Sequence, residues 1–376
     1  MLFREIIGQG VLKKRLLQSV KDQKIGHAWL FSGSEGSGAL ALALSFARYI
    51  LCTDPHETDA CNICSGCVKS GKYIHPDMHF IFPVNKTKTR DTENPVSDDF
   101  IKEFREFLRL NPYGNLNQWY DFIDLENKQG IIGTEESKRI TAKLSLKSFE
   151  SEYKVTLIWH PEKMNAQAAN KLLKLIEEPP PLTIFIMVSE NPDQLLQTIK
   201  SRCIPLRVPR IENDDLLRIL QEKHALEKAE AMNLIRLAEG NYLRINELLT
   251  NTGGEDDNFS IFRDLMRSCF RCNIQELVLF SENLSSCTRE KQKTFLEYGL
   301  KIIRESMIFH FQEKDLNIIP DTETDFTVKF SPFVNANNVV ELYDEFNKAF
   351  ADIERNANSK IVFLDLSLKL SVLIKK

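Results

Sequence analysis

Apolar residues follow two different patterns along the chain, and the change comes near residue 208. Before it, short continuous apolar runs predict buried strands at His27–Gly33, Tyr153–His160 and Leu182–Glu190. Runs of helix-forming residues predict two helices. One is Ala39–Leu51, directly after a group of glycines, and the other is Asn165–Glu178, which three prolines end. Strands that alternate with helices predict an α/β fold with a parallel, doubly wound sheet.

After that point the pattern is helical throughout. We therefore expect an α/β domain over residues 1–208, a small helical domain over 209–252 and a C-terminal helical domain over 258–376. The polar, glycine-rich stretch Asn251–Asn258 predicts the linker between the last two. The stretch Ile361–Ile374 fits strand alternation and helical spacing about equally well, so periodicity leaves its structure open.

One segment of the α/β region departs from the alternation. Residues 84–129 are polar and punctuated by prolines, with a single amphipathic stretch at Asp98–Leu110. We interpret this segment as an insertion in the α/β domain. Its composition does not indicate a role.

The charge balance excludes some classes of function. The chain has 49 Lys and Arg against 53 Asp and Glu, so it lacks the overall basic character that drives independent nucleic-acid binding. Its apolar runs are far shorter than the roughly 20 residues of a membrane span. The first residues also lack the apolar core of a signal peptide. We expect a cytoplasmic protein that does not contact membranes.

Four of the eight cysteines lie close together in the sequence, at Cys52, Cys61, Cys64 and Cys67. In a cytosolic chain such a cluster favours metal binding over disulfides. Four thiolates can enclose a zinc ion tetrahedrally and leave no open position for catalysis. The alternative is a chance group of buried cysteines, but regular spacing in a polar loop argues against it. We predict a structural zinc module over residues 52–67.

The stretch "FSGSEGSGAL" has the glycine spacing of a phosphate-binding loop. Such loops read G-x-x-x-x-G-K-[ST], and Gly33, Gly36 and Gly38 supply the glycines. Ala39 replaces the lysine, which removes a charge-assisted hydrogen bond typically worth about 1.5–3 kcal/mol. Leu40 replaces the hydroxyl that would bind magnesium. We therefore do not expect ATP binding, and the glycines would serve close packing of strand and helix.

The strand that should present catalytic carboxylates is altered as well. It ends in Trp159 and His160, and Glu162 lies two positions beyond. No group in the expected place could hold magnesium or activate water. The sequence thus predicts a chain without ATPase activity of its own.

Several stretches together resemble one family. They are "IIGQ" (Ile6–Gln9), "HAWLFSGSEGSG" (27–38), the four-cysteine module, "AANKLLKLIEEPPP" (Ala168–Pro181) and "TIKSRC" (Thr198–Cys203). The chain resembles the delta prime family of bacterial DNA polymerase III clamp-loader subunits, which are AAA+ proteins. The resemblance covers the first two predicted domains well and the third weakly. The defective phosphate loop separates it from the tau/gamma ATPase subunits.

The resemblance gives roles to residues that spacing alone leaves unremarkable. By spacing, Arg202 is a loop arginine beside a small buried cysteine. In clamp loaders this arginine is a finger that reaches the ATP of a neighbouring subunit, and comparable fingers in GTPases are worth about 10³–10⁵ in rate. The resemblance also places Ser189 and Arg244 at sensor-like positions. It implies a helical lid domain and a C-terminal helical collar domain.

The resemblance thus implies a non-catalytic AAA+ subunit that helps to load the sliding clamp on primed DNA during replication. Its partners would be the tau/gamma ATPase and delta subunits, the clamp, and DNA through the complex. One alternative is an ATP-binding clamp-loader ATPase, which tight MgATP binding by the isolated chain would favour. The other is a zinc-dependent nucleic-acid-binding module, which salt-sensitive DNA binding by the isolated chain would favour.

Overall fold

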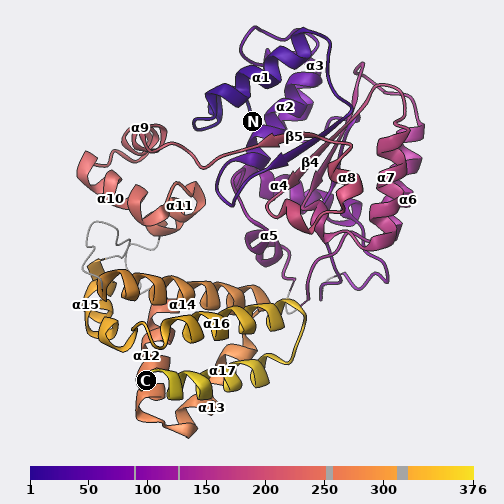
Figure 1. Ribbon diagram of the computed structural model, residues 1–376. Coiled ribbons are helices and arrows are strands. Elements are labelled where there is room, and N and C mark those ends of the chain that lie inside the picture. Colours follow the sequence, from indigo (N-terminus) through magenta and orange to yellow (C-terminus); the bar gives the residue numbers. More distant parts are fainter. Residues whose placement is uncertain (89, 126–127, 251–256, 311–320) are drawn as a thin grey trace. The chain divides into compact units, whose positions relative to one another are not determined.

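The computed structural model describes residues 1–376 except 89, 126–127, 251–256 and 311–320 (Figure 1). These residues form two compact units, Met1–Glu247 and Leu248–Lys376. Division of the first unit into an α/β domain and a separate helical domain at residue 208 stays a prediction. No helix within the described ranges is long and apolar enough to cross a membrane.

A five-stranded sheet forms the centre of the first unit. Its strands are β1 (Ala28–Ser32), β2 (Met78–Ile81), β3 (Lys154–Trp159), β4 (Thr183–Ser189) and β5 (Ile204–Arg207). They lie in the order β2-β3-β4-β1-β5, and every neighbouring pair is parallel. The predicted α/β fold class with a parallel sheet is confirmed. Strands β3 and β4 are buried along their whole length, as expected when helices cover both faces.

Alternate residues of β1 show how the two faces are covered. Ala28 and Leu30 belong to a buried cluster with residues of α6 and α7, which lie together on one side of the sheet (Figure 1). Trp29 and Phe31 point to the other face, where both rings pack against Phe46 of α2. Helix α1 (Gly10–Lys21) precedes β1. The helices between the first four strands are α2 (Ala39–Ile50), α3 (Ser65–Gly71), α4 (Ile101–Leu110), α5 (Leu116–Phe122), α6 (Thr134–Ser145) and α7 (Ala166–Glu177).

The predicted insertion over residues 84–129 is built into the core of the first unit. Most of its amphipathic stretch forms α4, and a second helix, α5, follows. The ring of Phe104 in α4 stacks on Phe82 with centroids 3.7 Å apart. The indole of Trp119 in α5 packs edge-on against both rings and donates a hydrogen bond to the Pro83 carbonyl at 2.9 Å. The segment is thus a packed layer beside the sheet.

Four helices complete the first unit or lead out of it. The short α8 (Gln197–Lys200) precedes β5, and α9 (Asn213–His224), α10 (Lys228–Ala238) and α11 (Tyr242–Thr250) follow it. The predicted linker after α11 falls largely outside the described residues.

The second unit is helical. It contains α12 (Asp257–Arg271), α13 (Ile274–Ser286), α14 (Arg289–His310), α15 (Asp321–Phe330), α16 (Val339–Glu354) and α17 (Ser359–Leu373). The stretch that periodicity left open is α17. It begins where the Asn358 side chain accepts the backbone N–H groups of Lys360 and Ile361. Its buried side chains, which include Phe363, Leu366 and Leu370, belong to one cluster with residues of α12, α13, α14 and α16, so apolar positions occur on more than one side of the helix.

Candidate functional sites

The degenerate phosphate loop lies between β1 and α2, and we call residues 33–40 the cradle. Gly36 and Gly38 have φ angles of +69° and +86°, in the left-handed region that glycine adopts readily. Gly38 is the N-cap of α2. Gly33 is held beside the neighbouring strand because its N–H donates to the Ser189 carbonyl at 3.2 Å. The loop therefore has left-handed backbone at two of its glycines, and Ser189 lies next to its start.

The space in front of this backbone is filled by the chain's own side chains. A Cβ atom on Gly36 would stand 1.8 Å from Asn241 Oδ1, and one on Gly38 would stand 2.8 Å from Cε1 of Tyr113. The remaining cavity has a volume of about 20 Å³, room for about one water molecule. Ligand pockets usually measure about 300 Å³ or more. Ala39 and Leu40 are buried in α2 and offer no polar group.

The charge around the cradle is also wrong for phosphates. Glu35 lies within the loop, and its pKa is raised because the carboxyl is largely buried. Glu190 lines the remaining cavity. A phosphate at the cradle would therefore lie near two carboxyl groups, and Ala39 stands where phosphate-binding loops have a lysine.

The end of β3 carries a histidine–carboxylate pair. His160 Nδ1 lies 3.0 Å from Glu162 Oε1, and both side chains are buried. Burial alone would lower the pKa of His160, but the carboxylates of Glu190 and Glu162 raise it above its ordinary value. Because Glu162 is bound to the imidazole, its carboxylate is committed to an internal pair.

Arg244 lies in α11, close to the residue that fills the cradle. Its backbone N–H donates to Asn241 Oδ1 at 3.1 Å, and its guanidinium lies 3.3 Å from Glu247 Oε2. This arginine therefore has a partner on its own helix. The structure brings together the cradle, Ser189 and the backbone of Arg244, and the sensor-like roles of these two residues stay a prediction.

Arg202 lies away from the cradle, just before β5. Strands β1 and β5 are parallel and in register. The cradle follows the carboxyl end of β1, whereas Arg202 precedes the amino end of β5, so the two lie at opposite ends of the parallel strands. The guanidinium of Arg202 donates to the Thr198 carbonyl at 3.0 Å and pairs with Glu177 at 2.7 Å. Cys203 is buried, with its sulfur 3.0 Å from the Ile199 carbonyl. The buried cysteine thus anchors the loop while the arginine stays at the surface.

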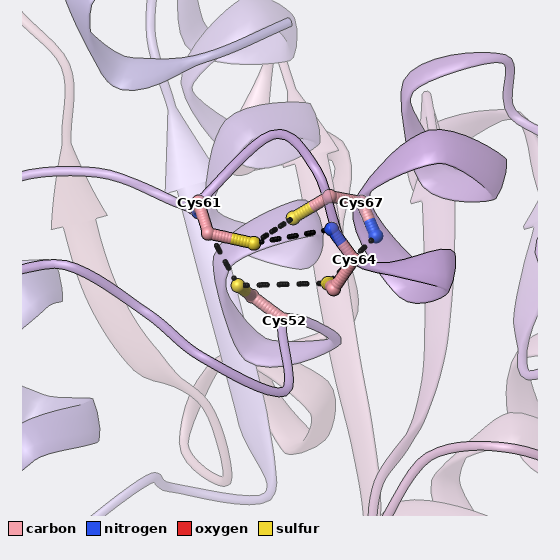
Figure 2. A group of neighbouring side chains, drawn as sticks. All are labelled: Cys52, Cys61, Cys64 and Cys67. Atoms are coloured by element: carbon pink, nitrogen blue, oxygen red, sulfur yellow. Dashed lines mark hydrogen bonds between the residues drawn. The ribbon is translucent and has the colours of Figure 1, made fainter.

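The four clustered cysteines meet in space. Their Sγ atoms all lie within 4.8 Å of one another (Figure 2). The Cys61–Cys67 and Cys52–Cys64 sulfur pairs are 3.8 and 4.0 Å apart. A ZnS₄ tetrahedron with Zn–S bonds of about 2.3 Å has edges of about 3.8 Å. The described residues contain no other group of at least three metal-ligating side chains this close together.

Backbone amides support the same interpretation of the cysteine cluster. The N–H groups of Cys61, Cys64 and Cys67 point at the sulfurs of Cys52, Cys61 and Cys64, at 3.4, 3.4 and 3.3 Å. Such donors favour sulfurs that carry negative charge. Burial raises the pKa of the Cys52 thiol, and a bound cation would favour its deprotonated form. The donor set and its geometry fit a metal ion with four sulfur ligands.

Two residues that contact the cradle, Tyr113 and Asn241, were not found by sequence reasoning. Tyr113 belongs to the segment between α4 and α5, 75 positions from Gly38, and no motif marks it. Asn241 follows Gly240 directly before α11, where an asparagine indicates only a helix N-cap. Neither position gives a signal of contact with the cradle until the fold is known.

Comparisons with known proteins agree with this combination of features. A family model described as DNA polymerase III, delta subunit, matches residues 8–212, more than half of the chain. The chain is 27% identical over 190 residues to the DNA polymerase III subunit delta' of Bacillus subtilis, covering 50% of this chain and 44% of that protein. It is 30% identical over 223 residues to that of Pseudomonas aeruginosa, covering 59% and 55%.

A subunit of a second type is similar over a longer stretch. The DNA polymerase III subunit tau/gamma of Haemophilus influenzae is 21% identical over 386 residues, covering 96% of this chain and 48% of that protein. The matched regions thus span about half the length of these three curated relatives. The family match over more than half of the chain is decisive. This chain belongs to the DNA polymerase III delta subunit family.

Proposed function

We propose that this protein is a clamp-loader subunit of DNA polymerase III that does not hydrolyse ATP itself and acts on the ATP of a neighbouring subunit. It would assemble with tau/gamma and delta subunits in the cytoplasm and help to load the sliding clamp on primed DNA. The observation that carries the proposal is the filled cradle. A site with room for about one water molecule cannot accept a nucleotide without rearrangement.

Arg202 supports the second half of the proposal. It lies at the amino ends of the strands, whereas the cradle lies at their carboxyl ends, so it is badly placed to contact a nucleotide bound to its own chain. Its side chain is 40% exposed, and its ion-pair partner Glu177 is 39% exposed. A guanidinium presented in this way can reach a phosphate on a neighbouring molecule and offset the charge that develops in phosphoryl transfer.

The four-cysteine cluster has a structural part in this proposal. We assign it to a zinc ion that joins the end of α2 to α3. Cys52 follows α2, and Cys64 is the N-cap of α3, so one ion would fix the loop between the two helices. Four sulfur ligands leave no open position, so this zinc would take no part in a reaction.

The test uses a loader reconstituted from its ATPase, delta and present subunits. The DNA- and clamp-stimulated ATPase rate is measured with the wild-type chain, with Arg202→Ala and with Arg207→Ala. Arg207 lies on β5 and is also an exposed arginine, so it is the matched control. We expect at least a tenfold fall for Arg202→Ala only, with assembly unchanged in gel filtration. An unchanged rate for Arg202→Ala would contradict the proposed finger.

A second candidate function has one observation in its favour. The similarity to the tau/gamma subunit of Haemophilus influenzae covers 96% of this chain, which an ATP-binding subunit of that type would explain. The missing lysine and the filled cradle oppose it. Calorimetric titration of the isolated chain with MgATP separates the two, because the first candidate predicts no binding at millimolar nucleotide.

A further inference from the structure

We propose that Tyr113 and Asn241 take the place of a nucleotide in the cradle and hold the helical segment α9–α11 to it through the start of α11. We call these two side chains the plug. The inference rests on the contacts of the cradle and is independent of any role for Arg202. It gives the insertion over residues 84–129 a function, since Tyr113 belongs to it.

Asn241 joins the cradle to the helical segment. Its Oδ1 atom lies where a Cβ of Gly36 would stand, so the side chain fits only because Gly36 has none. The next residue, Tyr242, donates its N–H to the Gly36 carbonyl at 3.4 Å. The same Asn241 oxygen accepts the N–H of Arg244 and so caps α11. One asparagine therefore links the start of α11 to the loop that would otherwise hold phosphate.

Tyr113 fills the other side of the cradle. Its ring lies against Gly38 and meets the ring of Tyr242 edge-on, with centroids 5.0 Å apart. Its hydroxyl accepts the N–H of Ile7 at 2.9 Å. The ring thus contacts the cradle, α11 and the N-terminal segment at once. A loop with the glycine spacing of a phosphate-binding loop is here bridged to the helices by an aromatic ring.

A carboxyl of the cradle lies near both the insertion and the helical segment. Burial raises the pKa of Glu35, and the side chains of Asn115 and Asn241 act to lower it. Asn115 is also the N-cap of α5, accepting the Gln118 N–H at 2.8 Å. The amides of the insertion and of the helical segment therefore converge on one residue of the loop.

The insertion presents Tyr113 from a rigid base. Tyr113 lies in the short connection between α4 and α5, whose Phe104 and Trp119 are fully buried among aromatic rings. A ring on such a base loses little conformational freedom when it packs into the cradle. In a chain whose cradle held a nucleotide, the ligand would make these contacts only while bound. In this chain the contacts are permanent, so the position of α9–α11 does not depend on ATP.

Hydrogen–deuterium exchange of the full-length chain tests the inference. We compare the wild type, Tyr113→Ala and the control Phe122→Ala, which shortens an aromatic of the same insertion at its partly exposed margin. We expect amides in residues 213–247 to exchange about tenfold faster in Tyr113→Ala, with β3 and β4 as protected as in the wild type. The control should leave both regions unchanged. Unchanged exchange over 213–247 in Tyr113→Ala would overturn the inference.

A second variant covers the case in which Tyr113→Ala does not fold, as judged by loss of a cooperative thermal transition. Asn241→Ser keeps an oxygen that can cap α11 but is too short to reach Gly36. The same acceleration over residues 213–247 is expected, and normal protection would overturn the inference. Millimolar MgATP should not change exchange of residues 33–40 in the wild type. If MgATP protected residues 33–40 from exchange, both this inference and the proposed function without ATP hydrolysis would be overturned. If Tyr113→Ala left exchange over residues 213–247 unchanged, only this inference would be overturned.

Discussion

The guanidinium of Arg202 lies 2.7 Å from the carboxylate of Glu177, the last residue of α7. Both side chains are partly exposed, and ion pairs at the surface contribute only about 0–1 kcal/mol. The pair can therefore open at little cost when a phosphate offers a better partner. Glu177 would keep the arginine extended and ready in the free subunit, and release it in the assembly.

This relationship predicts that Glu177→Gln has a small effect on the stimulated ATPase rate, whereas Arg202→Ala has a large one. Because the glutamine removes a partner that competes with phosphate, the stimulated ATPase rate of the reconstituted loader should stay within about threefold of the wild type. Chemical denaturation should show a loss of less than about 1 kcal/mol in the free energy of unfolding. If Glu177→Gln lowered the ATPase rate as much as Arg202→Ala, the pair would be part of the active arrangement and not a resting one.

The geometry of the cysteine cluster predicts that removal of one of the four thiols is enough to release the metal. Cys61→Ser removes a ligand whose sulfur lies 3.8 Å from that of Cys67. We expect bound zinc, measured by mass spectrometry of the purified chain, to fall from one equivalent to near zero. The free energy of unfolding should fall by about 3 kcal/mol or more, because metal binding is coupled to folding of the loop.

The control for the metal site is Cys272→Ser. Cys272 is exposed and belongs to the second unit, away from the cluster in the sequence. This variant should keep a full equivalent of zinc and wild-type stability. A full equivalent in Cys61→Ser would show that the cluster is not the zinc site.

The aromatic core of the insertion predicts a large loss of stability on truncation. Trp119→Ala removes a fully buried indole and leaves the Pro83 carbonyl without its donor. We expect a loss of about 3–5 kcal/mol in the free energy of unfolding measured with urea. Phe122→Ala, on the same helix but 36% exposed, should cost less than half as much. Equal, small losses for the two would mean that the insertion folds independently of the core.

The strands recognised from the sequence are those whose burial is complete. Strands β1, β3 and β4 occupy the middle of the sheet, and helices on both faces make them continuously apolar. The edge strands β2 and β5 were not predicted. Each has four residues, and β5 is partly exposed and contains Pro205, so neither offers a recognisable run. Edge position therefore explains why the sheet was only partly predictable.

The candidate sites divide in the same way. The cysteine cluster and the glycines of the cradle are local in the sequence, and residue spacing alone predicted both. The plug is different, because Tyr113 and Gly38 meet only through the packing of the whole insertion. Sequence pattern shows that the lysine is missing from the cradle. It cannot show that a tyrosine has taken the space of a ligand.

A buried carboxyl in α6 predicts how stability depends on pH. The side chain of Glu136 accepts the Ser97 N–H at 2.6 Å, and the residue is 5% exposed. Burial raises its pKa from 4.5 to about 7. Between these values the folded chain holds a proton that the unfolded chain has lost. Stability therefore falls as pH rises through this window, by at most about 1.4 kcal/mol per pH unit for this group.

Glu136→Gln keeps an acceptor for the Ser97 N–H and removes the buried charge. Its free energy of unfolding should therefore rise relative to the wild type as pH goes from 5 to 7.5, which urea denaturation at the two pH values can measure. Glu135→Gln, the exposed neighbour in the same helical turn, is the control and should not show this change. An offset between Glu136→Gln and the wild type that is equal at both pH values would mean that Glu136 is ionised throughout. The carboxylate would then be stabilised by the N-terminal turn of α6 and the Ser97 N–H more strongly than burial opposes it.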